Sequence, residues 1–412
     1  MKFSVITRSC VKNLAGADIA FVLICTGLVF IMTPGLAFFY GGLLRKKNII
    51  NMMTMCFVSI SIVTVAWFII GYSLAFAPDI GGGFIGGFNF LGLFGVGTDA
   101  NPVYSDAMPH LLYMIFQLMF AIITVAIIAS PFAERVNFKA FMIFISIWLI
   151  IVYSPIAHWV WGDGGWLNTL GARDFAGGTV VHINVGFASL AVALVIGPRK
   201  GYQEEPMEPS NIPYVLLGMG LLWIGWFGFN GGSALAANST AVLAIVNTHI
   251  AASTAGLIWM IIEYYKTGKF SSLGLATGGL AGLVAITPAA GFVEPWAALI
   301  IGAVVAVICY STLTWRSKSK IDESLDAWAV HGWGGIWGAI ATGIFASVGA
   351  TGLITGNPGQ VWIQTVGVIV TLVYTFVVTW IIAKVIDKVM GLRASEEEEY
   401  IGIDITIHGE KV

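Results

Sequence analysis

Asp174 and His182 lie eight residues apart in the segment 174–190, which reads DFAGGTVVHINVGFASL and is otherwise apolar. An ionisable side chain at bilayer depth is costly and usually belongs to a substrate pathway or a proton relay. In a helix, eight residues span about 12 Å. We therefore predict a polar pathway that begins near Asp174 and passes His182. Because small residues follow Asp174, it is also typical of a helix N-cap, and a capping carboxylate near a mouth would favour a cation as well.

A second histidine, His331, lies in the apolar segment AWAVHGWGG. A neutral imidazole is both donor and acceptor, so two rings can share one N–H···N bond and offer their remaining nitrogens to a polar guest. Burial disfavours the charged ring, so such a pair would pass a neutral molecule more readily than an ion. A single membrane histidine more often bridges helices, which is our interpretation of His249 in NTHIAAS.

Aromatic and polar residues recur at helical spacing in three apolar stretches. Such side chains usually face lipid or pack between helices. An aromatic cluster with one hydroxyl group would instead bind a small cation by cation–π attraction and a hydrogen bond. Spacing alone does not bring the three stretches together. The residues are Phe116, Gln117 and Phe120 in the first stretch, Trp161 in the second, and Trp226, Phe229 and Ser233 in the third.

The composition indicates a polytopic membrane protein. Hydrophobic residues make up 58% of the chain and charged residues 10%, with a mean hydropathy of +0.87, whereas soluble domains are about half apolar and a quarter charged. The 50 glycines fall mainly inside apolar runs, where small residues allow close helix packing. The first seventeen residues lack an obvious cleavage site, so we expect an uncleaved N-terminus.

Several other classes of protein function are disfavoured. The net charge of −2 and the absence of basic and aromatic interleaving exclude nucleic acid as a partner. The four cysteines have no paired spacing that would indicate a disulfide framework or a metal cluster. The histidines lack a carboxylate or thiolate at metal-ligand spacing, and no activated nucleophile is evident. We therefore expect neither an enzyme nor a cofactor.

Apolar runs near the length of about 20 residues needed to cross a bilayer can be counted along the chain. They predict an all-α membrane domain with eleven transmembrane helices. Their approximate ranges are 17–39, 50–76, 109–131, 138–157, 176–196, 213–235, 240–264, 272–290, 296–314, 327–347 and 360–385.

Positive charge predicts the orientation, because cytoplasmic loops are enriched in Lys and Arg. With the N-terminus outside, only Lys2, Arg8, Lys12 and Arg173 of the twenty Lys and Arg residues lie outside. The sequence therefore predicts an N-out, C-in topology. It also predicts that the Gly-rich, aromatic segment 77–108 forms a compact cap over the outer face.

Eleven spans suggest two five-helix halves, at about 17–196 and 213–347, and one additional helix at 360–385. Spans one and six contain related motifs, LVFIMTPGLAFFYGG and LLWIGWFGFNGGSA, and spans five and ten each contain one histidine. An odd number of spans per half makes the repeat inverted, which places a substrate path between the halves. The membrane domain would end near residue 385. The acidic segment 204–209 and the hydrophilic tail 386–412 are the expected partner-docking segments.

Several ordered motifs closely resemble the family of ammonium transporters, methylammonium permeases and Rhesus proteins, and its ammonium transporter branch in particular. They are MTPGLAFFYGGLLRKKN at 32–48, then HWVWGDGG, DFAGGTVVHIN, IGWFGFNGGSA, AVHGWGG and GIDITIHGE. The resemblance covers essentially the whole chain. It implies a plasma-membrane homotrimer for nitrogen uptake, with a pore in each subunit. It also implies that a PII-type signalling protein contacts the cytoplasmic loops and tail.

The resemblance also implies residue roles. Ammonium, or its analogue methylammonium, would be recruited by an outer aromatic site, and ammonia would pass a gate and a histidine pair, with the proton moved separately. By motif position, the outer site is Trp161, Ser233, Phe120 and Trp226, the gate is Phe120 and Phe229, the pore pair is His182 and His331, the organising acid is Asp174, and Gln117 lies beside the gate.

Other functions remain open at this point. The same fold could act as an ammonium sensor that signals through its tail, or as a neutral ammonia gas channel. Composition alone also permits a secondary transporter of another small cation or amine, which the motifs disfavour.

Overall fold

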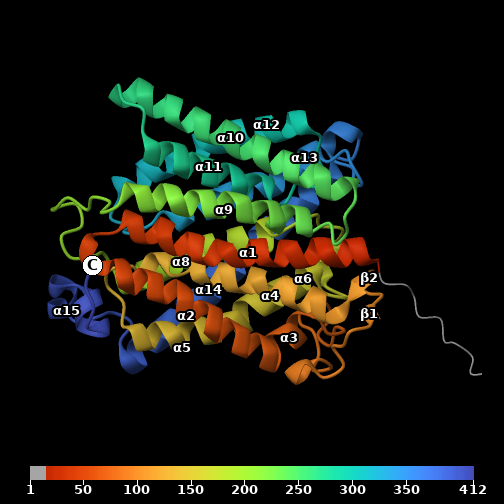
Figure 1. The fold of residues 1–412 in the computed structure, drawn as a ribbon, viewed down its shortest axis with the longest axis horizontal. Helices are drawn as coiled ribbons and strands as arrows, with labels where there is room; N and C mark the ends of the chain where they lie inside the picture. The colour runs from red at the N-terminus through yellow and green to blue at the C-terminus, as the bar shows by residue number, and fades with distance from the viewer. Residues whose placement is uncertain (1–14) are drawn as a thin grey trace, which may run out of the picture.

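The computed structural model describes residues 15–412, which form a bundle of long, roughly parallel helices (Figure 1). The expectation of an uncleaved N-terminus falls on residues 1–14 and lies outside the described residues. One end of the bundle carries the two-stranded antiparallel sheet of β1 (Ala100–Asn101) and β2 (Ser105–Pro109), and we call it the hairpin face. The opposite end carries α15 (Glu396–Ile401), and we call it the tail face.

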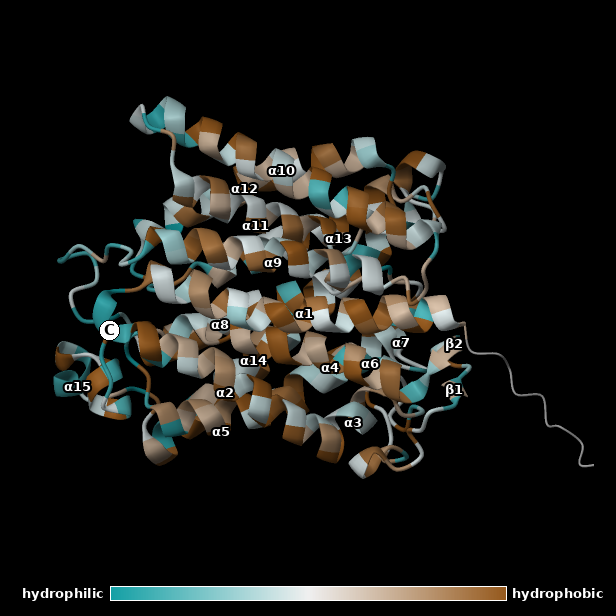
Figure 2. Cartoon of the chain, in the orientation of Figure 1, coloured by the Kyte–Doolittle hydropathy of each residue, from teal (hydrophilic) through white to brown (hydrophobic). Residues whose placement is uncertain are grey.

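The helices are mostly apolar along their length, with hydrophilic residues gathered towards the tail face (Figure 2). Within residues 15–412, nine helices are long and apolar enough to cross a membrane. They are Gly16–Leu43, Lys46–Phe76, His110–Phe132, Phe138–Leu170, Gly178–Ile196, Ile212–Gly232, Ser239–Thr267, Pro295–Ser317 and Gly359–Met390.

Two of the eleven predicted spans fall on shorter helices. The expected span 272–290 corresponds to α11 (Ser272–Ile286), and 327–347 corresponds to η7 (Trp328–Gly332) followed by α13 (Trp333–Phe345). The polytopic helical class is therefore confirmed, while the count of eleven spans stays a prediction.

Several spans consist of more than one element. The α-helices are α1 (Gly16–Leu43), α2 (Ile49–Ala66), α3 (Tyr72–Phe76), α4 (His110–Ile127), α5 (Phe138–Trp148), α6 (Ser154–Trp161), α7 (Trp166–Leu170), α8 (Asn184–Ile196), α9 (Ile212–Gly232), α10 (Ser239–Thr267), α12 (Pro295–Ser317) and α14 (Gly359–Met390). The π-helical turns besides η7 are η2 (Trp67–Gly71), η5 (Leu149–Tyr153), η6 (Gly178–Ile183) and η9 (Asp404–His408). Short 3₁₀ turns are η1 (Lys46–Asn48), η3 (Leu91–Leu93), η4 (Ser130–Phe132) and η8 (Leu353–Thr355).

Glycine lets the first helices of the two halves touch. A Cβ atom on Gly218 of α9 would lie 2.3 Å from the backbone nitrogen of Phe39 in α1, and one on Gly35 would lie 2.9 Å from the Cβ of Leu221. Such distances are too short for any larger residue, so α1 and α9 pack backbone to backbone. This contact joins the predicted halves along the middle of the bundle (Figure 1).

The tail is docked on the tail face. The Asp404 carboxylate accepts the backbone N–H groups of Ile50 and Asn51, at 3.0 and 2.7 Å, at the start of α2. The Lys47 ammonium group donates to the carbonyl oxygens of Glu399 and Tyr400. The tail therefore touches the first loop of the tail face directly.

Candidate functional site

Two phenylalanine rings meet in the middle of the bundle. Phe120 of α4 and Phe229 of α9 are stacked, with centroids 4.2 Å apart and an interplanar angle of 27°. The indole of Trp161 meets Phe120 edge-on at 6.0 Å. The structure thus brings together the three stretches that spacing alone did not connect.

A cavity of about 360 Å³ lies on the hairpin-face side of this stack. Of the residues singled out from the sequence, it is lined by Phe116, Gln117, Phe120, Trp161, Asp174 and Ser233. The Ser233 hydroxyl donates to the carbonyl oxygen of Phe229 at 2.8 Å, which leaves its lone pairs able to accept a bond. Aromatic faces and one hydroxyl oxygen suit a small cation that carries N–H donors.

Trp226 does not line this cavity, although the resemblance groups it with the outer site. Its indole instead stacks on the ring of His182, with centroids 5.4 Å apart, and its Nε1–H donates to the Thr287 hydroxyl at 2.9 Å. Trp226 therefore lies farther from the hairpin face than Trp161, on the side of the stacked phenylalanines that faces the histidine pair.

The two histidines predicted to act together are in contact. The Nδ1 atoms of His182 and His331 lie 3.2 Å apart, and both side chains are buried. One ring must donate and the other accept, so the two rings are in different tautomers. Neither Nε2 atom has a hydrogen-bond partner among residues 15–412. The pair therefore shares one bond and keeps one free nitrogen on each ring.

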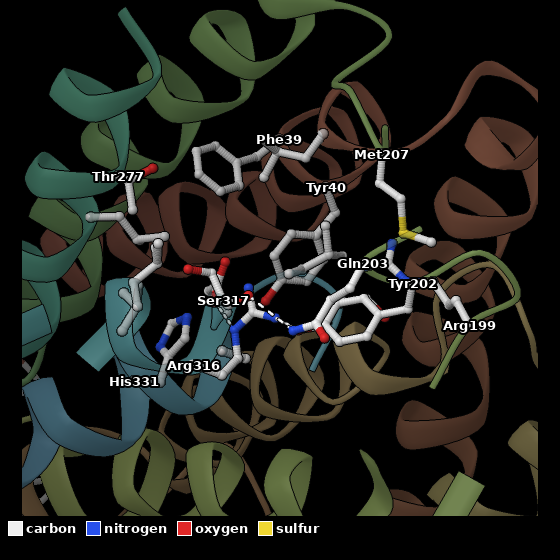
Figure 3. Close-up of a pocket in the computed structure, with 18 of the residues that line it drawn as sticks. Phe39, Tyr40, Arg199, Tyr202, Gln203, Met207, Thr277, Arg316, Ser317 and His331 are labelled. Carbon is white, nitrogen blue, oxygen red and sulfur yellow. Dashed lines mark hydrogen bonds and ion pairs between the residues drawn. The ribbon is translucent and has the colours of Figure 1, made fainter. Parts of the chain in front are cut away.

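A second cavity, of about 350 Å³, opens on the tail-face side of the pair (Figure 3). His331 lies in its wall, together with Tyr40, Tyr202, Arg316 and Asp326. From hairpin face to tail face, the order is a cavity, the phenylalanine stack, the histidine pair and a second cavity. The stacked rings and the histidine pair therefore lie between the two cavities.

Asp174 organises the turn that carries His182. Its carboxylate accepts four backbone N–H groups at 2.7 to 3.2 Å, from Gly177, Gly178, Thr179 and Val180. Gly177 has φ +121°, a conformation that favours glycine. The capping interpretation is confirmed, and because Trp161 donates its indole N–H to the carbonyl of Asp174 at 3.0 Å, the cap is tied to the cavity as well.

Glu323 is a residue that the sequence interpretation missed. It precedes His331 by eight residues, as Asp174 precedes His182. Its Oε2 accepts the backbone N–H of Trp328 at 3.1 Å, at the start of η7, and its Oε1 accepts the Ser130 hydroxyl. The repeated spacing between acid and histidine was a signal that would have identified Glu323.

Close backbone contact keeps the histidine-bearing turns together. A Cβ atom on Gly186 would lie 2.3 Å from the backbone nitrogen of Gly332, so nothing larger than glycine fits at position 186. Gly186 follows His182 by one helical turn, and Gly332 follows His331 directly. The distance between the two rings therefore depends on this glycine contact.

Buried ion pairs hold the loops of the tail face. Asp322 accepts both Nε and Nη2 of Arg199 at 2.9 Å and Nη1 of Arg135 at 2.7 Å. Glu134 pairs with Arg45 at 2.7 Å and with Arg199 at 3.3 Å. These links join the loop after α4, the loop after α8 and the segment before η7, and so they position η7 and His331.

The pKa values in this network follow from burial and charge. Burial alone would raise the pKa of Asp322, but Arg135 and Arg199 lower it to about 2. Burial raises the pKa of Glu323 to about 7, and the nearby Asp326 carboxylate adds to the rise. Asp322 is therefore ionised at neutral pH, whereas Glu323 exchanges its proton near neutrality.

His249, the remaining histidine within a predicted span, lies apart from the two cavities and the histidine pair. His249 is exposed on the outer surface of α10, where its ring contacts Trp223 and Phe227. The structure therefore does not bring His249 to the histidine pair. Among the described residues, no group of three His, Cys, Asp or Glu side chains is arranged to hold a metal ion.

The fold is that of a multi-pass membrane protein in which the stacked phenylalanines and the histidine pair lie between two cavities. Residues 20–412 match the family described as the Ammonium Transporter Family, and the chain belongs to that family. It is 49% identical to the ammonium transporter Amt1 of Archaeoglobus fulgidus over 96% of this chain and 99% of the relative. It is 48% identical to an ammonium transporter of Bacillus subtilis, over 96% and 98% of the two chains.

Solved structures agree with this assignment. The crystal structure of Saccharomyces cerevisiae Mep2 is similar with a TM-score of 0.86 and 35% identity, over 94% of this chain and 89% of that one. A structure described as a sensor Amt protein is similar with a TM-score of 0.89 and 30% identity, over 95% and 98%. The fold therefore occurs both in Mep2 and in a protein described as a sensor Amt protein.

Proposed function

We propose that the chain takes up ammonium by binding it in the hairpin-face cavity, removing a proton near the phenylalanine stack and passing ammonia along His182 and His331. The proton is moved separately and is returned to ammonia on the tail-face side. Membership of the ammonium transporter family supports ammonium as the substrate. The observation that carries the mechanism is the buried pair itself, with Nδ1 atoms 3.2 Å apart beneath the Phe120–Phe229 stack.

The reason for deprotonation is the energy of burial. Ammonium and potassium carry the same charge and are of similar size, so charge alone does not separate them. A buried ion loses several kcal/mol of solvation in an apolar lumen, whereas neutral ammonia crosses at much lower cost. Potassium has no proton to lose, so it is rejected at the same point.

The roles within the site follow the order of the residues. Trp161, Ser233 and Phe120 would hold ammonium through cation–π attraction and a hydroxyl acceptor, with Gln117 beside them, and Phe120 and Phe229 would form the gate. Asp174 would fix the turn that presents His182. Trp226 packs on His182, so we assign it to the pore wall below the gate.

The topology and assembly that we propose are those expected from the sequence. The protein has eleven spans, with inverted halves at about 17–196 and 213–347, an eleventh helix at 360–385 and a cytoplasmic tail at 386–412. Two features support the inverted repeat: η6 and η7 are both π-helical turns followed by helices of 13 residues, and they start from opposite faces. The hairpin face is then the outer face, and the assembly is a plasma-membrane homotrimer contacted by a PII-type protein at the tail face.

A sensor function is the second candidate. The likeness to the sensor Amt protein favours it, as does the direct docking of the tail on the start of α2. Measuring uptake in liposomes against ammonium-dependent partner binding separates the two functions. Appreciable flux in the absence of any partner supports the transporter.

The mechanism is tested by current recordings from reconstituted protein on solid-supported membranes, with ammonium pulses at several potassium concentrations. We expect a transient ammonium current that potassium does not change. The double variant His182→Ala, His331→Ala should lose this selectivity, and His249→Ala is the matched control because its ring lies outside the path. Unchanged selectivity in the double variant would show that the histidine role is wrong. A silent but ammonia-permeable protein would indicate a neutral gas channel.

A further inference from the structure

One cationic side chain lies at the mouth of the proposed cation site. Arg173 lines the hairpin-face cavity together with Trp161, Phe120 and Ser233, and its side chain is exposed. Every other Lys and Arg within residues 15–412 lies at or near a helix end on the tail face or in the tail. A site built for a cation therefore has a fixed positive charge in its wall.

The backbone of Arg173 is held in place by α14. The Gln364 side chain accepts the backbone N–H of Arg173 and donates to its carbonyl oxygen, both at 2.7 Å. Gln360, one turn earlier, donates to the carbonyl oxygen of Gly171 at 3.0 Å. The segment before Asp174 is thus clamped through its main chain, so a change of the Arg173 side chain leaves the clamp in place.

Among the residues that the structure describes, no carboxylate forms an ion pair with the Arg173 guanidinium group. None of the ion pairs among residues 15–412 includes Arg173. The adjacent Asp174 carboxylate is buried and occupied by four backbone N–H groups. Arginine stays charged at every physiological pH, so the charge acts on any ion in the cavity.

We propose that Arg173 sets the affinity of the hairpin-face cavity for monovalent cations by repelling them electrostatically. This inference rests on the proposed function and deepens it. At separations of roughly 8 Å in well-hydrated surroundings, one unit charge changes cation binding by about two- to fivefold. The repulsion acts on charge alone, so it changes KM for ammonium and methylammonium by the same factor and leaves the maximal rate unchanged.

The test uses the full-length protein in proteoliposomes, with uptake measured against ammonium concentration at low and high ionic strength. Arg173→Gln should lower KM about two- to fivefold at low ionic strength, and Arg173→Glu should lower it further. Arg173→Lys keeps the charge and should keep the KM of the unchanged protein. The differences should shrink at high ionic strength, because salt screens exposed charges beyond about 10 Å at 0.1 M.

Lys269→Gln is the matched control. It removes the same charge from an exposed loop on the tail face, between α10 and α11, and should leave KM unchanged. If Arg173→Gln is not recovered in folded form, Arg173→Glu against Arg173→Lys gives the same comparison of charge. Normalising the rates to the amount of folded protein corrects the maximal rate for expression, and KM does not depend on that amount.

Two results would overturn the inference. One is an unchanged KM in both Arg173→Gln and Arg173→Glu at low ionic strength. The other is an equal fall of KM in Arg173→Lys, which would indicate shape rather than charge. A failure of the proposed function can be told apart from these results, because the unchanged protein would then take up no ammonium.

Discussion

Asp174 and Glu323 each precede a buried histidine by eight residues. Asp174 accepts backbone N–H groups from the π-helical turn that carries His182, and Glu323 accepts one, that of Trp328, from the turn that carries His331. The two turns start from opposite faces of the bundle and meet where His182 contacts His331. Each carboxylate thus positions one half of the pair.

Replacing Asp174 should damage both stability and transport. In Asp174→Asn the amide nitrogen replaces one acceptor oxygen and faces N–H groups that it cannot satisfy. Losing hydrogen bonds to a charged group costs about 3 kcal/mol. We expect a lower melting temperature in detergent and a severe loss of uptake. Asp163→Asn, at an exposed turn of the same face, is the control, and equal behaviour of the two variants would contradict the capping role.

Glu323 should make stability depend on pH near neutrality. Its folded pKa of about 7 lies above its ordinary value of 4.5, so the folded state binds the proton more tightly. Its contribution is therefore present below about pH 4.5 and is lost as pH rises through 7. The groups that act on it are Asp326, Arg316 and the Ser130 hydroxyl.

The variant Glu323→Gln carries no charge at any pH. Its melting temperature relative to the unchanged protein should therefore rise between pH 5 and 8, by an amount equivalent to about 3 kcal/mol at most. Thermal unfolding in detergent across this range measures the difference. A difference that does not vary with pH would show that Glu323 does not titrate there.

The stability that Asp322 contributes should depend on pH in the opposite direction from that of Glu323. Its pKa of about 2 lies below its ordinary value of 3.8, so its contribution is present above about pH 4 and is lost only as pH falls towards 2. Asp322→Ala leaves two buried guanidinium groups without their shared partner, which costs about 3–5 kcal/mol. The loss should be constant from pH 5 to 8. Glu396→Gln, which breaks an exposed pair with Lys200, should change the melting temperature little.

The glycine contact beside the histidines should tolerate no side chain. In Gly186→Ala the added Cβ would meet the backbone of Gly332, so the two turns must separate and the 3.2 Å contact between the rings is lost. Overpacking of this kind costs about 1–3 kcal/mol. We expect reduced ammonium selectivity over potassium together with a lower melting temperature. Gly220→Ala is the control, since a Cβ there meets nothing within 4 Å, and it should preserve both properties.

The sequence alone was sufficient for the class of protein. Long apolar runs and scarce charge predict a polytopic helical protein, because only helices satisfy their backbone groups inside a bilayer without partners. In the part of the chain that the structure describes, nine helices of sufficient length agree with this. The motifs around His182 and His331 predicted the family, and the family match covers residues 20–412. The spacing of Asp174 before Gly-Gly predicted its capping role, which is local and depends on few neighbours.

The tertiary structure decided which side chains meet. His182 and His331 are separated by 149 residues, and Phe120 and Phe229 come from different predicted halves. In a soluble protein, hydropathy marks the buried face of each helix, but in a bilayer the lipid-facing side is as apolar as the core. The hydropathy pattern therefore could not show that His249 is exposed, that Trp226 stacks on His182, or that Arg173 lines the hairpin-face cavity. Those positions depend on contacts between distant segments, such as the bonds from Gln364 to the Arg173 backbone and from Trp226 to Thr287, which form only when the helices pack together.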